Sequence, residues 1–160
     1  MKITKPICSL IVAALFACLL MVPSLCLASV PVSEVSLGGI ALGSSPDYVY
    51  QIYGRPDHSS TTYSHPLWTG KVTDWRYGNS VNVTFRNDQV IHVDVSANNG
   101  FATPAGITVG MKSSVPQNLY GSPDKHSSSF MFYSAGSDYQ GVRFQLRNGV
   151  ITVISIGWFD

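Results

Sequence analysis

Two short stretches with helical spacing of apolar residues occur along the chain, one in each half. In the first half, Val49, Ile52 and Tyr53 follow the i, i+3, i+4 spacing of one helix face. Ser45 precedes them as a cap, and Gly54 follows them as a residue that ends helices. The pattern predicts a short helix between these two residues, with its apolar face buried.

The second half repeats this design. Ser113 stands in the capping position and Gly121 in the stop position. Leu119 and Tyr120 occupy the places of the apolar pair in the first helix. We therefore expect a second short helix, with these two side chains on its buried face.

Strand patterns follow each predicted helix. Residues 81–86 and 142–147 alternate between apolar and polar side chains, which is the period of a half-buried strand. Residues 91–95 alternate in the same way, and Asn148-Gly149 is a strong hairpin signal. The stretch 150–156 is apolar on both faces, so we expect it in the middle of a sheet or between the two halves.

The two halves also match each other in sequence. Residues 39–57 align without a gap with residues 106–124, and residues 81–87 align with 142–148. The identical positions of the first block are Gly39, Ile40, Gly43, Tyr53, Gly54, Pro56 and Asp57. Colinear blocks in the same order indicate an internal duplication.

These patterns predict an α+β fold of two tandem repeats. Each repeat would be a short helix, or a helical hairpin, packed on a three- to four-stranded antiparallel sheet. We place repeat unit 1 at residues 29–97, a linker at 98–105 and repeat unit 2 at 106–160. Units of under about 65 residues are marginally stable alone, so we expect a shared interface or a continuous sheet.

Residues 1–28 have the pattern of a secretory signal peptide. Lys2 and Lys5 form a positive start, and residues 11–22 form an apolar run that small residues follow. We expect cleavage after Ala28. The apolar run is shorter than the roughly 20 residues that span a bilayer, and we expect no transmembrane segment in the mature protein.

The cysteines all fall within this segment, at Cys8, Cys18 and Cys26. The expected mature protein therefore lacks a thiolate for a metal site or for nucleophilic catalysis. Leu25 precedes Cys26 where a lipobox has a small residue, so we expect no lipid anchor there. The export signal predicts a periplasmic or extracellular location.

Charge excludes one class of partner. The sequence contains 10 basic and 9 acidic residues, and charged residues make up 12% of it. Removal of residues 1–28 takes two lysines away and leaves a net charge near zero. Such a protein has no electrostatic footprint for nucleic acid.

The repeated motif resembles a known family. Gly-Ile-x-x-Gly, followed ten positions later by Tyr-Gly-x-Pro-Asp and then by an aromatic strand and a hairpin, resembles the SmpA/OmlA family of outer-membrane assembly lipoproteins. The motif residues are Gly43, Tyr53, Gly54 and Pro56, and again Gly110, Tyr120, Gly121 and Pro123. The tandem form is similar to the β-lactamase-inhibitory proteins. The resemblance covers residues 39–158 and implies an extracytoplasmic protein-binding module. The motif residues are structural, so it transfers no active site.

Histidines offer an alternative, enzymatic interpretation. His92 and Asp94 alternate on one strand and point to the same face, so they can form the orienting half of a general base. No Gly-x-Ser-x-Gly motif accompanies them. His58 and His65 lack the spacing of a metal site, and we expect neither a metal nor a cofactor.

Aromatic and arginine side chains are the stronger binding signal. Tyr63 and Trp68 lie in an insertion that the second half lacks. With Arg76, Arg86 and Arg143 they have the composition of an interface hot spot. Ordinary core packing of the aromatic residues is the competing interpretation.

The leading hypothesis is an exported, non-enzymatic protein-binding module of the envelope-assembly or hydrolase-inhibitor type. Its partner would be another envelope protein or a secreted protein. The alternatives are a small secreted enzyme that uses His92 and Asp94 as a general base, and a purely structural component of the envelope.

Overall fold

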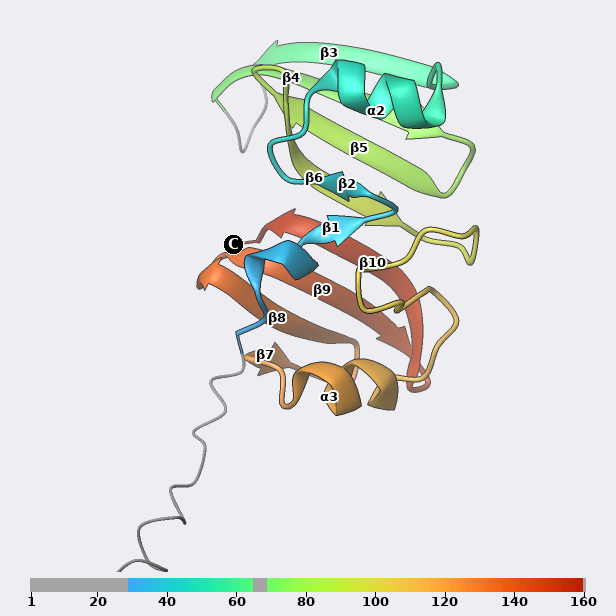
Figure 1. Ribbon diagram of the computed structural model, residues 1–160, viewed down its shortest axis with the longest axis vertical. Helices are drawn as coiled ribbons and strands as arrows, with labels where there is room; N and C mark the ends of the chain where they lie inside the picture. The colour runs from blue at the N-terminus through green and yellow to red at the C-terminus, as the bar shows by residue number, and fades with distance from the viewer. Residues whose placement is uncertain (1–28, 65–68, 160) are drawn as a thin grey trace, which may run out of the picture.

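Eight antiparallel strands form one continuous sheet in the computed structural model, which describes residues 29–64 and 69–159 (Figure 1). In spatial order the strands are β3 (His58–Ser64), β4 (Thr69–Tyr77), β5 (Val81–Arg86), β6 (Gln89–Val95), β10 (Val150–Trp158), β9 (Gln140–Arg147), β8 (Phe130–Ser137) and β7 (Lys125–His126). The expected signal peptide, Trp68 and His65 lie outside the described residues.

The predicted fold class is wrong in its central feature. Instead of two repeats with a small sheet each, eight of the ten described strands form a single sheet, because β6 and β10 pair antiparallel in its middle. Val95 pairs with Ile154, and Val93 pairs with Ile156. The predicted central place of residues 150–156 is confirmed. A strand that is apolar on both faces is best buried between two neighbouring strands, and here β6 and β9 flank it.

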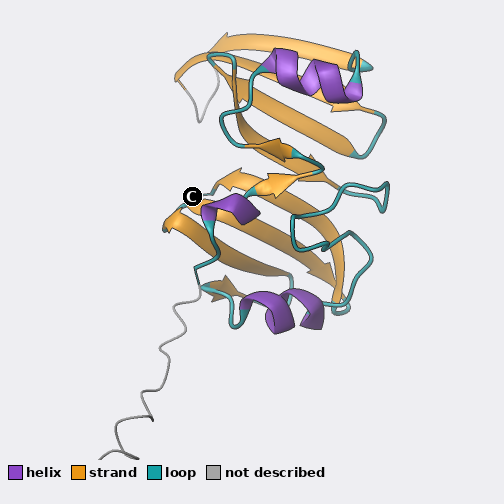
Figure 2. Cartoon of the chain, viewed as in Figure 1, coloured by secondary structure: helices purple, strands orange, loops and turns teal. Residues whose placement is uncertain are grey.

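Helices cover one face of this sheet. The helical elements are η1 (Val32–Glu34), α2 (Pro46–Tyr53) and α3 (Ser114–Tyr120), and a small hairpin consists of β1 (Ser36–Leu37) and β2 (Ile40–Ala41). Figures 1 and 2 show α2, α3 and this hairpin on the same side of the sheet. Between these elements and the sheet lies the hydrophobic core, with Tyr133, Phe85 and Phe144 among its largest fully buried side chains.

The first helix is capped as predicted, and the second is not. The Ser45 side chain accepts a hydrogen bond from the Tyr48 amide at 3.2 Å. The Ser113 side chain makes no capping bond, because the backbone of this residue is already helical, with φ −59° and ψ −22°. Gly54 and Gly121 end the helices as predicted, with φ values of 72° and 82° that favour glycine.

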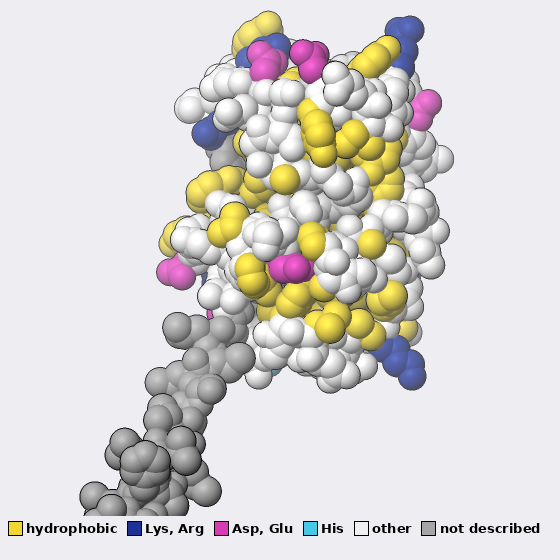
Figure 3. All heavy atoms as spheres, viewed as in Figure 1, with side chains coloured by type: hydrophobic (Ala, Val, Ile, Leu, Met, Phe, Trp, Pro, Cys, Tyr) yellow, Lys and Arg dark blue, Asp and Glu magenta, His cyan; other side chains and the backbone are white. Residues whose placement is uncertain are grey.

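The predicted buried face of the helices is only partly correct. Val49 is fully buried and Tyr53 is half-buried, but Ile52 is 44% exposed. In the second helix Leu119 is 55% exposed and Tyr120 is half-buried. Each helix has only about two turns, so it offers the core a narrow line of contact, and a side chain beside that line stays in solvent. Figure 3 shows the resulting hydrophobic side chains between the helices on this face.

Two tyrosines of the repeated motif, Tyr53 and Tyr120, hydrogen-bond to residues 34–38, which lie on the face of the sheet that the helices cover. The Tyr53 hydroxyl donates to the Gly38 carbonyl, and the Tyr120 hydroxyl donates to Glu34 Oε2 at 2.6 Å. Burial is the largest cause that raises the pKa of both phenols. These contacts give the motif a structural role. Of the other motif positions, Gly43 and Gly110 have positive φ, and Pro56 and Pro123 are half-buried.

Candidate functional site

The face of the sheet opposite the helices carries a row of polar and charged side chains. The row follows the strand register: Arg76 pairs with Asn82, Asn82 with Asp94, Asp94 with Ser155, Ser155 with Arg143, Arg143 with Phe132, and Phe132 with Lys125. In β5 and β6 these side chains alternate with buried valines of the core. They therefore project from the uncovered face. We call this set the cross-strand row.

Asp94 is the centre of the row. His92 Nε2 lies 3.1 Å from Asp94 Oδ1, and the Ser155 hydroxyl donates to the same oxygen at 2.5 Å. Burial is the largest single influence on this carboxyl group and opposes its ionisation. The hydrogen bonds from His92 and Ser155, with the charges of His92 and Arg143, outweigh burial and hold the pKa of Asp94 below its ordinary value.

Gly157 makes room for the His92 ring. The two residues are register partners, and a Cβ atom at position 157 would collide with His92 Nδ1. The ring of Phe159 then packs edge-on against His92 at 5.3 Å and against Phe132 at 5.4 Å between centroids. The histidine ring is thus enclosed by the sheet backbone and by an aromatic side chain.

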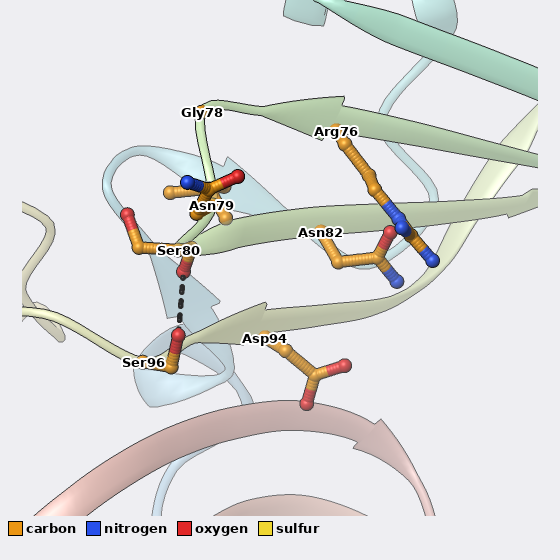
Figure 4. Close-up of a pocket in the computed structure, with 8 residues that line it drawn as sticks. Arg76, Gly78, Asn79, Ser80, Asn82, Asp94 and Ser96 are labelled. Carbon is orange, nitrogen blue, oxygen red and sulfur yellow. Dashed lines mark hydrogen bonds between the residues drawn. The ribbon is translucent and has the colours of Figure 1, made fainter.

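The larger cavity on this face lies at one end of the row. It has a volume of about 350 Å³ and is lined by Arg76, Asn82 and Asp94, by the β4–β5 turn and by Ser96. Figure 4 shows these three side chains projecting from three neighbouring strands. Asn82 Oδ1 is buried and has no hydrogen-bond partner. The cavity is thus lined by an amide side chain between a cation and a carboxylate.

A smaller cavity of about 100 Å³ lies toward the other end. Its lining residues are Lys125, Phe130, Phe132, Arg143 and Phe159. The guanidinium carbon of Arg143 stands 4.8 Å from the centroid of the Phe130 ring, and the Nε of Arg143 is buried without a partner. Each cavity therefore contains one arginine of the predicted set and one unpaired buried polar atom.

The structure brings together only part of the predicted binding site. Arg76 and Arg143 share the cross-strand row, with β5, β6 and β10 between their strands. Arg86 lies at the end of β5, and Tyr63 is 76% exposed on the edge strand β3. Trp68 is outside the described residues.

Four residues of this face were not predicted as site residues: Asn82, Ser155, Phe159 and Lys125. The alternation of residues 81–86 already pointed Asn82 outward, and Ser155 is the one hydroxyl residue among the hydrophobic residues 153–156. Nothing in the sequence signalled the positions of Phe159 and Lys125. No group of three or more His, Cys, Asp or Glu side chains suited to a metal ion occurs in residues 29–64 and 69–159.

Comparison with known proteins identifies a shared fold. No family model and no curated protein matches the chain. Among solved structures, the chain is similar to an extracellular protein containing an SCP domain from Bacillus anthracis str. Ames, with 12% identity, a TM-score of 0.50 and coverage of 74% of this chain. It is also similar to a cysteine-rich secretory protein from Staphylococcus aureus, with 11% identity, a TM-score of 0.48 and 72% coverage.

The likeness is limited to fold. The chain spans 44% of the length of each of these two proteins. At 12% identity the shared feature is the arrangement of the elements, and site residues cannot be transferred. Within the described part of the chain, every helix falls short of the length and apolar character needed to cross a membrane.

Proposed function

We propose that this protein is an exported, non-enzymatic binding module that engages another extracytoplasmic protein through the uncovered face of its sheet. The observation that carries the proposal is the cross-strand row itself, in which Arg76, Asp94 and Arg143 line two cavities on the same face.

The charges of the cross-strand row support a protein partner. Arg76, Asp94 and Arg143 place positive, negative and positive charge along one line. Four strand spacings separate the two arginine positions, which is about 19 Å. This length suits a protein interface of standard size better than a small molecule. A partner with the opposite order of charges would be complementary.

Two further observations support export, and the motif resemblance supports the class of partner. Residues 1–28 have the pattern of a signal peptide, and the similar structure from Bacillus anthracis is that of an extracellular protein. The motif resemblance to SmpA/OmlA proteins and to β-lactamase-inhibitory proteins favours an envelope protein or a secreted hydrolase as the partner. The repeated motif residues contribute to the fold rather than to this contact.

The enzymatic alternative is less well supported by the geometry. In a serine triad the nucleophile bonds to the histidine, but the Ser155 hydroxyl donates to Asp94 instead. His92 Nδ1 lies against Gly157, where a substrate has no room. We therefore favour a role for His92 and Ser155 in orienting the Asp94 carboxylate.

Cross-linking capture with charge variants tests the proposal. The full-length protein, expressed with its own N-terminal segment and recovered after export, serves as bait in the envelope and secreted fractions of its host. We expect one dominant partner, which Arg76→Glu and Arg143→Glu each lose. Arg147→Glu is the matched control, because Arg147 is exposed at the end of the same strand as Arg143 and lines neither cavity. An empty capture, or a partner retained by both row variants, would overturn the proposal.

A further inference from the structure

Two cations share the smaller cavity of the uncovered face. Lys125 comes from the edge strand β7 and Arg143 from β9, and three phenylalanine rings complete the lining. None of these five lining residues is acidic. A cavity with two positive groups beside three aromatic rings favours an anion, because charges attract more strongly near low-dielectric walls than in bulk water.

Neither cation has an acidic partner in an ion pair. The ion pairs Lys71–Asp88 and His92–Asp94, both in the described part of the chain, involve other cations. Lys125 Nζ instead lies 5.7 Å from the centroid of the Phe132 ring. Asp94 is the acidic group whose pKa the charge of Arg143 lowers, and its Oδ1 already accepts a hydrogen bond from Ser155. Asp124 Oδ2 accepts hydrogen bonds from the Ser134 amide and hydroxyl at 2.7 and 2.8 Å. Asp138 lines a neighbouring cavity that Lys125 borders from its other side.

Arg143 is held in place for recognition. Its guanidinium carbon lies 4.8 Å from the Phe130 centroid and 6.0 Å from the Phe159 centroid. A planar guanidinium that is fixed between rings loses little freedom when it binds, and its parallel N–H donors match the two oxygens of a carboxylate. The buried Nε–H of Arg143 has no acceptor.

The volume limits the size of the ligand. About 100 Å³ corresponds to roughly three water molecules at about 30 Å³ each. A carboxylate with one or two methylene groups fits this space. We infer that the Lys125–Arg143 cavity binds a carboxylate of the partner protein, either from an acidic side chain or from the partner's terminal carboxyl group. This inference rests on the proposed function and adds the chemistry of the partner.

Three tripeptides with an acetylated N-terminus and a phosphate probe test the inference by nuclear magnetic resonance on the exported full-length protein. The probes are acetyl-Ala-Glu-Ala-amide, its glutamine counterpart, acetyl-Ala-Gln-Ala with a free C-terminus, and inorganic phosphate. The measured signals are the side-chain Nε–H resonances of Arg143 and Arg147. We expect the glutamate peptide, the free C-terminus or both to shift the Arg143 signal, and the fully blocked glutamine peptide to leave it unchanged.

Variants and salt separate specific binding from general attraction. Arg143→Gln should weaken binding of the carboxylate peptide by about tenfold or more, because it removes a charge-assisted pair of hydrogen bonds. Lys125→Gln should weaken it by a smaller factor, and Arg147→Gln should leave it unchanged. Raising the ionic strength from about 0.01 M to about 0.15 M should weaken binding, since Lys125 is exposed and salt screens its charge.

The outcomes are distinct. Equal shifts with the glutamate and the fully blocked glutamine peptides, or binding by phosphate alone, would overturn the inference. So would unchanged affinity in Arg143→Gln with a native unfolding temperature. If Arg143→Gln does not fold, Lys125→Gln decides, because Lys125 is exposed on an edge strand. If the carboxylate inference fails but capture of a partner still depends on Arg76, the proposed function is retained.

Discussion

The Ser155 hydroxyl of β10 donates a hydrogen bond of 2.5 Å to Asp94 of β6, across the pair of strands that joins the two halves of the sheet. His92 contacts the same carboxylate oxygen from the strand of Asp94 itself. Asp94 thus connects strands from distant parts of the chain and forms the centre of the row that we assign to binding. The Asp94 carboxylate therefore contributes both to the contact between β6 and β10 and to the surface that we propose for binding.

Asp94→Asn should change how stability depends on pH. The pKa of Asp94 is lowered in the folded protein, so its ionised form stabilises the fold at any pH above its unfolded pKa. This contribution is lost as the pH falls through the lowered pKa. Urea unfolding at about pH 7 and about pH 2 should show a wild-type advantage over Asp94→Asn that shrinks in acid. An advantage that is constant or grows in acid would contradict the assigned shift.

Gly157→Ala should destabilise the protein by about 1–3 kcal/mol. The new Cβ would collide with His92 Nδ1 and would lie 2.8 Å from the Ile91 carbonyl oxygen. Gly100→Ala is the control, because Gly100 also has a positive φ, of 92°, but a Cβ added there would meet no atom within 4 Å. Denaturant unfolding should show the larger loss for position 157. Equal losses would mean that backbone strain alone matters and that the ring does not lie over the glycine.

Tyr133→Phe should remove one hydrogen bond between strand β8 and the end of α3. The buried phenol donates to the Gly121 carbonyl at 3.1 Å, so its loss should cost about 1 kcal/mol at neutral pH. Burial raises the pKa of Tyr133 to about 12. Its contribution is present below the unfolded pKa of about 10 and is lost as the pH rises toward 12. The variant should therefore lose less stability than wild type over this alkaline range, as thermal unfolding would show.

Trp68→Ala should abolish partner capture and leave the unfolding temperature unchanged. This prediction comes from the sequence alone, since Trp68 is outside the described residues. Trp158→Ala is the matched control, because Trp158 is 43% exposed and lines neither cavity of the uncovered face. A large drop in the unfolding temperature of Trp68→Ala would instead place this tryptophan in the core.

Local features of the fold were predictable because local chemistry decides them. The Ser45 cap, the two glycine stops and the central position of residues 150–156 follow from capping and burial within a few residues. The sequence left a shared interface and a continuous sheet both open, and the outcome depends on pairing between β6 and β10, which are far apart in sequence. The exposure of Ile52 depends on how the short helix lies on the sheet.

The candidate site was predictable only in part for the same reason. Alternation placed Asn82, His92 and Asp94 on one face, and composition singled out Arg76 and Arg143. Whether a polar atom finds a partner is a property of the packed sheet, so the unpaired Asn82 Oδ1 and Arg143 Nε had no sequence signal. The resemblance implied a protein-binding class without indicating the face that binds.

Site-directed photo-cross-linking is the most direct test of the central claim that the uncovered face binds the partner. A photoreactive side chain is placed either at Ser96, which is exposed beside the larger cavity, or at Tyr50, which is exposed on α2. The full-length protein is then irradiated after export in its host. The account predicts a covalent adduct with one protein from position 96 and none from position 50. An adduct from position 50 alone would contradict it and assign binding to the helical face.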